Sequence, residues 1–476
     1  MTSSPRQALY ASRPGRWILT ATVLGSGVAF LDSTVVNVAL PTISRDLHSG
    51  LTDLQWISDA YLLTLGALIV LGGSLGDRYG RRRIFVLGLA SFTLASVICG
   101  LAPNTLLLIS ARALQGIGGA LLVPGSLAII SASFVPGDRA RAVGMWSAMS
   151  GAVTAGAPFL GGWLVDSVSW RAIFFINVPL ASAAIVVASR HVPETRDEAA
   201  TGRIDVLGAA TISLGLAGVV YALIEGPGGG WSAPTVTAGV AGAALLVAFA
   251  IIELRSRNPM VPLGLFSSRQ FSGANLTTLG VYAALSAAAF LLVLHLQQDL
   301  HYSALAAGTA FLPATLLLVL FSSRSGALAQ RIGAQLPMTA GPITAALGLL
   351  LLGGIRPGDS YFTAVLPGVL VFGAGLTLTV APLTAAVMAA VDAHHLGVGS
   401  AINNATARIG GLLAVAVVPG LAGLSAASSH LAGVSLNEGF TAAMRISAGL
   451  LVAGGLIAAA TIRRVAPVQE PTAATA

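Results

Sequence analysis

The octapeptide GSLGDRYG (residues 73–80) returns 253 residues later as GALAQRIG (residues 326–333). Each copy follows an apolar run, and its glycines allow a tight turn between two helices. A second echo, ARAVG (residues 140–144) against HLGVG (residues 395–399), has a similar offset of 255 residues. Two echoes at nearly one offset predict a chain built from two related halves.

The composition indicates a membrane protein. The chain has 476 residues, of which 55% are hydrophobic and 9% are charged, whereas soluble domains carry about 25% charged residues. So few charges cannot cover a water-facing surface of this size. We therefore expect an all-α integral membrane protein.

A bilayer is crossed by about 20 mostly apolar residues, and fourteen runs of roughly this length can be marked. The first is too long for the apolar part of a signal peptide and no small-residue cleavage site closes it, so we interpret it as a retained span. The predicted spans are 17–40, 55–75, 84–102, 105–130, 143–166, 171–189, 204–224, 234–254, 272–295, 304–322, 336–354, 361–388, 397–422 and 440–462.

An even number of spans places both termini on one side, and arginine indicates which side. With the termini in the cytoplasm, 19 of the 25 arginines fall in cytoplasmic segments, and only Arg45 and Arg356 fall clearly in outer loops. Cytoplasmic loops of membrane proteins are enriched in this way. We expect a multi-pass protein of the cell membrane with both termini in the cytoplasm.

The repeat divides the spans into two bundles of six with two further helices between them. The predicted boundaries are 17–195 for the first bundle, 203–254 for the two-helix insert and 270–465 for the second bundle. Parallel halves of this kind recur in secondary transporters, which bind substrate at the interface of the halves near the middle of the membrane.

Several function classes are disfavoured. The chain contains no lysine, so a phosphate-binding loop of the G-x-x-x-x-G-K-[ST] type is impossible and ATP hydrolysis through such a loop is excluded. Cys99 is the single cysteine, and the histidines form no metal-ligand pattern. No nucleophile–base pair suggests an enzyme. We expect no cofactor, no metal, no nucleic acid partner and no ATP, and we expect a monomer.

Asp32 lies inside the first apolar run, far from any charge in the sequence. An ionisable residue inside a span is costly and usually marks a function. Burial raises the pKa of a carboxylic acid and a nearby arginine lowers it, so a carboxylate exposed to both influences can change its protonation. The alternative is a structural aspartate, either near outer water or permanently paired.

The fourth run places Arg112, Gln115, Gly116 and Gly119 on one helix face. Counted along their spans, Asp32 and Arg112 both lie in the outer half of the membrane, and Asp59 lies in a similar or more superficial layer. An arginine near the helix end could instead extend to the interface. Depth makes Arg112 a candidate partner of Asp32, and Asp59 a second candidate acid.

Four motifs resemble those of a known family. The loop GSLGDRYGRRR (residues 73–83) resembles the loop signature of the major facilitator superfamily. LDSTVVNVALP (residues 31–41), ARALQGIGGALLVPGSLAII (residues 111–130) and GAPFLGG (residues 156–162) resemble first-, fourth- and fifth-span signatures of its fourteen-helix drug:proton antiporter branch. QWISDAY (residues 55–61) also resembles that branch.

The resemblance implies the major facilitator fold and proton-coupled export of small amphipathic or cationic compounds such as drugs and antibiotics. It implies a proton-coupling group of Asp32, Asp59 and Arg112. In the loop it implies a cytoplasmic latch, which holds one conformation closed. Its residues would be Gly73, Asp77, Arg78, Gly80 and Arg81. In the fifth span it implies an antiporter helix shaped by Gly156, Pro158, Gly161 and Gly162.

The chain departs from the family pattern at two positions. Ala157 precedes Pro158 where the family usually has glycine, although Gly156 lies one residue earlier. In the second copy of the loop, Gln330 occupies the acidic position, so a latch there is expected to be weaker.

The remaining candidates would line a substrate cavity. Besides Asp32 and Asp59, the predicted lining is Trp56, Tyr61, Gln115, Asn403, Asn404 and Arg408. Trp56 and Tyr61 could stack on an aromatic cation, although anchoring at the membrane interface is the more common explanation for both residues. Asn403, Asn404 and Arg408 could instead form a packing patch or a patch that faces the cytoplasm. A dedicated metabolite exporter, an uptake symporter, a channel and a membrane enzyme remain as alternatives.

Overall fold

A computed structural model describes residues 7–197, 205–256, 259–392, 396–424 and 436–463. In this part of the chain, fourteen segments are helical, long enough and apolar enough to cross a membrane. The predicted number of spans is confirmed. The first positions of the predicted insert and the last of the second bundle, residues 203–204 and 464–465, lie outside the described residues.

The helices of the first half are α1 (Arg13–Leu47), α2 (Leu51–Tyr79), α3 (Arg81–Leu101), α4 (Thr105–Ser133), α5 (Pro136–Ser167), α6 (Ala172–Phe175) and α7 (Asn177–His191). The insert is α8 (Val206–Gly229) and α9 (Ala233–Arg255). The second half contains η1 (Leu263–Ser267), α10 (Arg269–Gln298), α11 (Ala304–Thr309), α12 (Leu312–Ile332), α13 (Gln335–Leu352), η2 (Tyr361–Val365), α14 (Leu366–Ala389), α15 (Leu396–Leu421) and α17 (Leu436–Thr461).

Capping residues and glycine determine where the helices begin and turn. Ser12 and Asn104 cap α1 and α4 by accepting hydrogen bonds from backbone N–H groups of the first turn, which have no partner inside a helix. Gly80 separates α2 from α3 at a φ of 113°, in a region that favours glycine.

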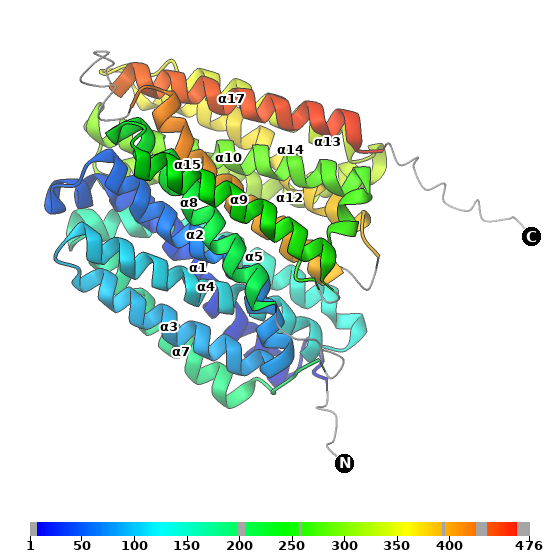
Figure 1. Ribbon diagram of the computed structural model, residues 1–476. Helices are drawn as coiled ribbons and strands as arrows, with labels where there is room; N and C mark the ends of the chain where they lie inside the picture. Colours follow the sequence, from blue (N-terminus) through cyan, green and yellow to red (C-terminus); the bar gives the residue numbers. More distant parts are fainter. Residues whose placement is uncertain (1–6, 198–204, 257–258, 393–395, 425–435, 464–476) are drawn as a thin grey trace, which may run out of the picture.

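The two halves pack mainly within themselves. In the first half α4 packs against α2 and α3, and α1 against α5 and α7; in the second, α13 packs against α14 and α17, and α10 against α15 and α17. In Figure 1 the first half (blue to cyan) and the second half (yellow to red) lie on opposite sides, with the green insert helices α8 and α9 between them.

The halves meet at one end of the bundle. We call the end with Arg13 and Thr461 the terminal end and the end with Leu47 and Leu51 the distal end. At the distal end a single hydrophobic cluster contains residues of both halves, for example Val35 and Leu291. Toward the terminal end each half has a separate cluster. The distal end is therefore closed by a core that the two halves share.

Glutamine side chains connect the halves within this closed end. Gln55 of α2 donates a hydrogen bond to the carbonyl oxygen of Val415 in α15, at 2.7 Å. Gln297 of α10 donates to the carbonyl oxygen of Val38 in α1, at 2.9 Å. Pro419 follows Val415 by four residues and has no N–H, so this carbonyl lacks its usual partner within the helix.

The insert helix α8 packs on both halves. It contacts α2 and α15 as well as α9, and a small buried cluster joins Val220 and Ile224 of α8 to Leu412 and Ala416 of α15. Figure 1 shows α8 beside α2 and α15. The insert therefore covers the line along which α2 and α15 meet.

Candidate functional site

Asp32 and Arg112 form a direct ion pair inside the first half. The Nη1 group of Arg112 donates to Oδ2 of Asp32, and the two side chains are 0% and 2% exposed. The partner inferred from depth alone is thus the residue that Asp32 contacts. Breaking such a pair by removing one partner is strongly unfavourable, because it leaves a buried charge uncompensated.

Two amide side chains bond to this pair, and a serine hydroxyl bonds to both amides. Gln115 donates to Oδ1 of Asp32 at 2.7 Å, and Asn177 donates to the same oxygen at 2.9 Å. Both amides also donate to the hydroxyl of Ser96, at 2.7 and 3.2 Å. All five side chains are buried. We call Asp32, Ser96, Arg112, Gln115 and Asn177 the closed polar centre.

Apolar and aromatic side chains shield the guanidinium of Arg112. Its Nε donates to the carbonyl oxygen of Ile57 at 3.2 Å. The ring of Tyr61 lies 4.4 Å from the Arg112 guanidinium carbon and that of Phe174 lies 6.0 Å away, within the range of cation–π attraction. Tyr61 itself is 1% exposed. In this conformation Tyr61 and Gln115, both predicted to line a cavity, pack against Arg112.

Asp59 lies apart from this centre, on the opposite face of α2. Ile57 and Tyr61 contact Arg112 of α4, whereas Gln55 bonds to α15. Asp59 follows Gln55 by one helical turn and therefore shares its face. Its carboxylate is fully buried, and neither oxygen has a hydrogen-bond partner in the described part of the chain. Asp59 is thus a buried acid where the two halves meet.

The polar residues of α15 form a second region, which we call the open polar region: Asn403, Asn404 and Arg408. Asn403 donates to Thr278 at 2.7 Å and to Asn275 at 3.2 Å, both in α10. All three members are partly exposed.

Arg408 lies in the middle of α15 and has no ion-pair or hydrogen-bond partner among the described residues. It faces the first half, because a Cβ added to Gly66 of α2 would lie 3.4 Å from its Cβ.

Trp56 connects the first half to the insert. Its Nε1 donates to the carboxylate of Glu225 in α8 at 2.8 Å, and its ring lies 6.3 Å from that of Tyr221. The sequence offered no role for Glu225. A single acid in an apolar helix indicates that a polar partner is near, but the sequence does not show which helix carries that partner.

The loop between α2 and α3 is held by local contacts. Arg81 donates from Nε to Asp77 at 2.8 Å, and the ring of Tyr79 lies 5.6 Å from the Arg78 guanidinium carbon. A Cβ added to Gly73 would lie 3.7 Å from the Cβ of Pro124 in α4. The predicted members are thus close together, and Asp77 bonds to an arginine of its own loop.

A residue that the sequence did not single out completes this loop. Glu194, after α7, accepts hydrogen bonds from the backbone N–H groups of Arg82 and Arg83, at 3.1 and 3.2 Å. These groups begin α3, where a carboxylate is favourable. A Cβ on Gly80 would lie 2.6 Å from the Glu194 carboxylate. Glycine is therefore favoured at this position for two reasons: its positive φ, and the close approach of Glu194.

The glycines of α5 allow close contacts with α1 and with the second half. A Cβ on Gly161 would collide with Val35 of α1, and one on Gly162 with the backbone of Leu305 in α11. The carbonyl oxygen of Pro158 packs against Gly308 of α11 in the same way. Gly156 has no such neighbour.

Next to these glycines, Asp166 accepts hydrogen bonds from the first N–H groups of α11. Its oxygens lie 3.1 Å from the nitrogen of Ala304 and 2.8 Å from that of Leu305. This contact belongs to the closed distal end.

The described residues contain no group of three or more His, Cys, Asp or Glu side chains that could hold a metal ion. The polar chemistry of the site consists of carboxylates, guanidinium groups and amides. Such groups can bind and release protons and can bind charged or polar solutes.

The sequence profile of the Major Facilitator Superfamily matches residues 22–415. The methylenomycin A resistance protein of Bacillus subtilis is 35% identical over 419 residues, covering 87% of this chain and 89% of the relative. The puromycin resistance protein of Streptomyces alboniger is 34% identical over 460 residues, covering 94% and 91%. The multidrug resistance protein Stp of Mycobacterium tuberculosis is 37% identical over 402 residues, covering 84% and 74%.

Solved structures share the fold. The crystal structure of the transporter PepTSo, of the POT family, superimposes with a TM-score of 0.69 at 15% identity, covering 94% of this chain and 97% of the other. A peptide transporter POT crystallised with sulfate gives 0.69 at 14% identity, covering 96% of each. At this identity the likeness shows the architecture alone.

Proposed function

This chain belongs to the major facilitator superfamily, and from that premise we propose that it is a proton-coupled antiporter that exports small amphipathic or cationic compounds by alternating access. Family membership makes it a multi-pass membrane transporter. Export of drugs or antibiotics is supported by relatives at about 35% identity that are named for resistance or export. The observation that carries the coupling is the buried Asp32–Arg112 pair.

Asp32 is the proton carrier in this proposal, and Arg112 adjusts its proton affinity. As a carboxylate, Asp32 attracts the guanidinium and accepts from Gln115 and Asn177. A protonated Asp32 loses the ionic attraction, so the closed polar centre would hold its helices less tightly. Since Asp32 is 0% exposed here, proton exchange requires another conformation. Asp59, buried where the halves meet, is the second candidate for this role.

The asymmetry of the two ends supports alternating access. The distal end is closed by a shared core and by the Gln55 and Gln297 hydrogen bonds, while each half has its own core toward the terminal end. We propose that the bundles 17–195 and 270–465 rock as units, with the insert 203–254 between them. Pro158 and the glycines beside it would form the moving contact with α11.

We assign the terminal end to the cytoplasm of a cell membrane, because most arginines fall in segments at this end. The loop of Gly73, Asp77, Arg78, Gly80 and Arg81 then lies on the cytoplasmic side. In the present state Asp77 is bonded locally to Arg81. In the alternate state it would hold that side closed.

Substrate would contact the open polar region together with Trp56 and Tyr61. Asn403, Asn404 and Arg408 are partly exposed, and Arg408 faces α2 across the interface of the halves. We propose that the protein works as a monomer with protons and small molecules as its partners.

The experiment is transport by purified protein in vesicles with a pH gradient, acidic on the outer face. Ethidium fluorescence follows export by the native chain, by Asp32→Asn and by the control Asp359→Asn, whose aspartate lies in an exposed loop. We expect gradient-driven transport in the native chain and the control, and none in Asp32→Asn.

If collapsing the gradient leaves native transport unchanged, proton coupling is wrong. Full coupling in Asp32→Asn would assign the proton to another group, and Asp59→Asn is the next variant to measure.

A further inference from the structure

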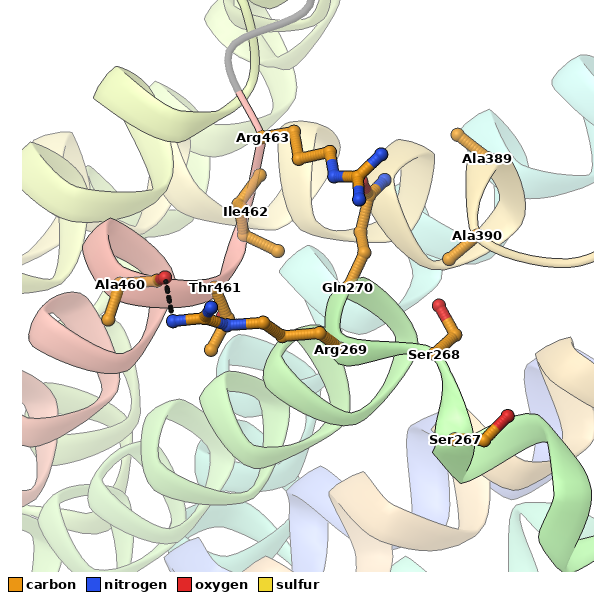
Figure 2. Close-up of a pocket in the computed structure, with 10 residues that line it drawn as sticks. All are labelled: Ser267, Ser268, Arg269, Gln270, Ala389, Ala390, Ala460, Thr461, Ile462 and Arg463. Carbon is orange, nitrogen blue, oxygen red and sulfur yellow. Dashed lines mark hydrogen bonds between the residues drawn. The ribbon is translucent and has the colours of Figure 1, made fainter.

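A cavity of about 560 Å³ opens at the terminal end of the second half, away from the two polar regions. Its wall is formed by the start of α10 (residues 267–270), the end of α14 (residues 389–390) and the end of α17 (residues 460–463). Figure 2 shows these residues around the opening. Three membrane helices end here, so the cavity lies at the level where the bilayer meets water.

The cavity is lined by two arginines and by no acidic residue. Arg269 is fixed to the wall, because its Nη2 donates to the carbonyl oxygen of Ala460 at 3.0 Å. Apart from this bond, its N–H groups have no hydrogen-bond partner among the residues that the structure describes. Arg463 is exposed and has no ion-pair or hydrogen-bond partner in the part of the chain that the structure describes. Figure 2 shows Arg463 and Gln270 among the residues that line the cavity.

Two guanidinium groups on one cavity favour an anionic ligand. A phosphate presents several oxygens and accepts paired hydrogen bonds from arginine. The remaining lining is small or polar, from Ser268, Ala389, Ala390 and Thr461. The volume is within the range of about 300–1,000 Å³ typical of small-molecule sites.

The surroundings favour a lipid as the source of that phosphate. The two helices that carry the arginines also carry exposed leucines deeper in the membrane, Leu276 on α10 at 50% exposure and Leu456 on α17 at 58%. Basic pockets between membrane helices on the cytoplasmic side are known to bind anionic headgroups. A phospholipid could place its phosphate in the cavity while its acyl chains remain in the bilayer.

We propose that this cavity binds the phosphate of an anionic phospholipid from the leaflet at the terminal end, through Arg269 and Arg463. The site belongs to the second half alone and is independent of the transported compound. A lipid bound there would connect the ends of α10, α14 and α17.

The test is lipid binding by the full-length protein in detergent, followed by native mass spectrometry. Phosphatidylglycerol is compared with phosphatidylcholine of the same acyl chains, and inorganic phosphate and glycerol phosphate are added as competitors. The variants are Arg269→Gln/Arg463→Gln and the single variant Arg463→Gln, which keeps the wall contact of Arg269. The control is Arg255→Gln/Arg331→Gln, which removes the same charge from exposed helix ends on the same side.

We expect one saturable phosphatidylglycerol site in the native chain and the control, with about tenfold weaker binding in the double variant and an intermediate loss in Arg463→Gln. Phosphatidylcholine should bind more weakly in all of them, and millimolar inorganic phosphate should not compete.

Equal phosphatidylglycerol binding by the double variant and the control would overturn the proposal. Equal binding of the two lipids would show that headgroup charge is not recognised and would overturn it as well. Complete competition by inorganic phosphate or glycerol phosphate would assign the cavity to a free phosphate compound and would overturn the lipid as its ligand. If the double variant does not fold, an unchanged affinity in Arg463→Gln counts against the site.

Discussion

Arg112 and Arg408 each lie inside a membrane helix of this protein, and their surroundings are opposite. Arg112 is buried, paired with Asp32 and stacked on Tyr61, whereas Arg408 is partly exposed and has no acidic partner among the described residues. A cation inside a span is costly in both places. The first half neutralises its cation internally. In the second half the charge remains available, and this is the property that a ligand-binding group needs.

Removing each arginine should give the largest difference between the two regions. Arg112→Ala leaves the Asp32 carboxylate buried without its cation, which costs about 3–5 kcal/mol of stability. Arg408→Ala leaves no such acid behind, and we expect a loss of about 1 kcal/mol. Thermal unfolding of the purified protein in detergent measures both losses. Equal losses would mean that Arg408 has a stabilising partner of its own.

Transport kinetics should distinguish the role of the open polar region from that of the closed polar centre, with the second-largest effect. In Arg408→Gln, the KM for an exported amphipathic compound with an acidic group should rise about tenfold, because a charge-assisted hydrogen bond contributes about 1.5–3 kcal/mol. The KM for ethidium should not rise, and the dependence on the pH gradient should persist. Uptake of both compounds into inverted vesicles gives these values. A loss of coupling without a change in KM would place Arg408 with Asp32 in function.

One asparagine of each region, Asn177 and Asn403, allows a test of the same contrast with a smaller expected effect. Asn177→Leu removes a donor from the buried Asp32 carboxylate and should cost about 1–3 kcal/mol, whereas Asn403→Leu removes hydrogen bonds near water and should cost about 1 kcal/mol. Unfolding of both variants in one detergent compares them directly. If Asn403→Leu is the more destabilised protein, the second region is a packing patch after all.

Cysteine labelling should show that the open polar region is accessible to solvent and the closed polar centre is not, with little change to the structure. Cys99 is 0% exposed and its thiol donates weakly to Gln115 at 3.7 Å, so a maleimide should not modify the folded native chain. Asn404→Cys, made in a Cys99→Ala background, should be modified quickly, because position 404 is partly exposed. The extent of labelling is read by mass spectrometry. Rapid modification of Cys99 would show that the closed polar centre admits solvent.

The fold could be predicted from the sequence, and so could the similar depth of Asp32 and Arg112, although not their contact. Fourteen apolar runs gave the spans, and counting residues from the span ends placed Asp32 and Arg112 at one depth. The depth of a residue in the membrane follows from the rise of the helix alone, so predicting it needs no knowledge of how the helices pack.

The rotation of each helix about its axis could not be predicted. In a soluble helix the apolar face identifies the core side, but lipid is as apolar as a protein core, so the sequence of a span does not show which face is inside. The partners of Asp32 on α3 and α7, Ser96 and Asn177, were missed for this reason. Asp59 could be assigned a depth but not a face, and it lies on the side of α2 opposite Arg112.

Pro419 has a consequence for how the two halves can separate. Because proline cannot donate, the Val415 carbonyl is a spare acceptor, and Gln55 uses it from the other half. When the halves part, water can take the place of the glutamine, and no hydrogen bond of the α15 backbone needs to break. In the proposed cycle, this contact between the two halves could therefore form and break repeatedly without unwinding a helix.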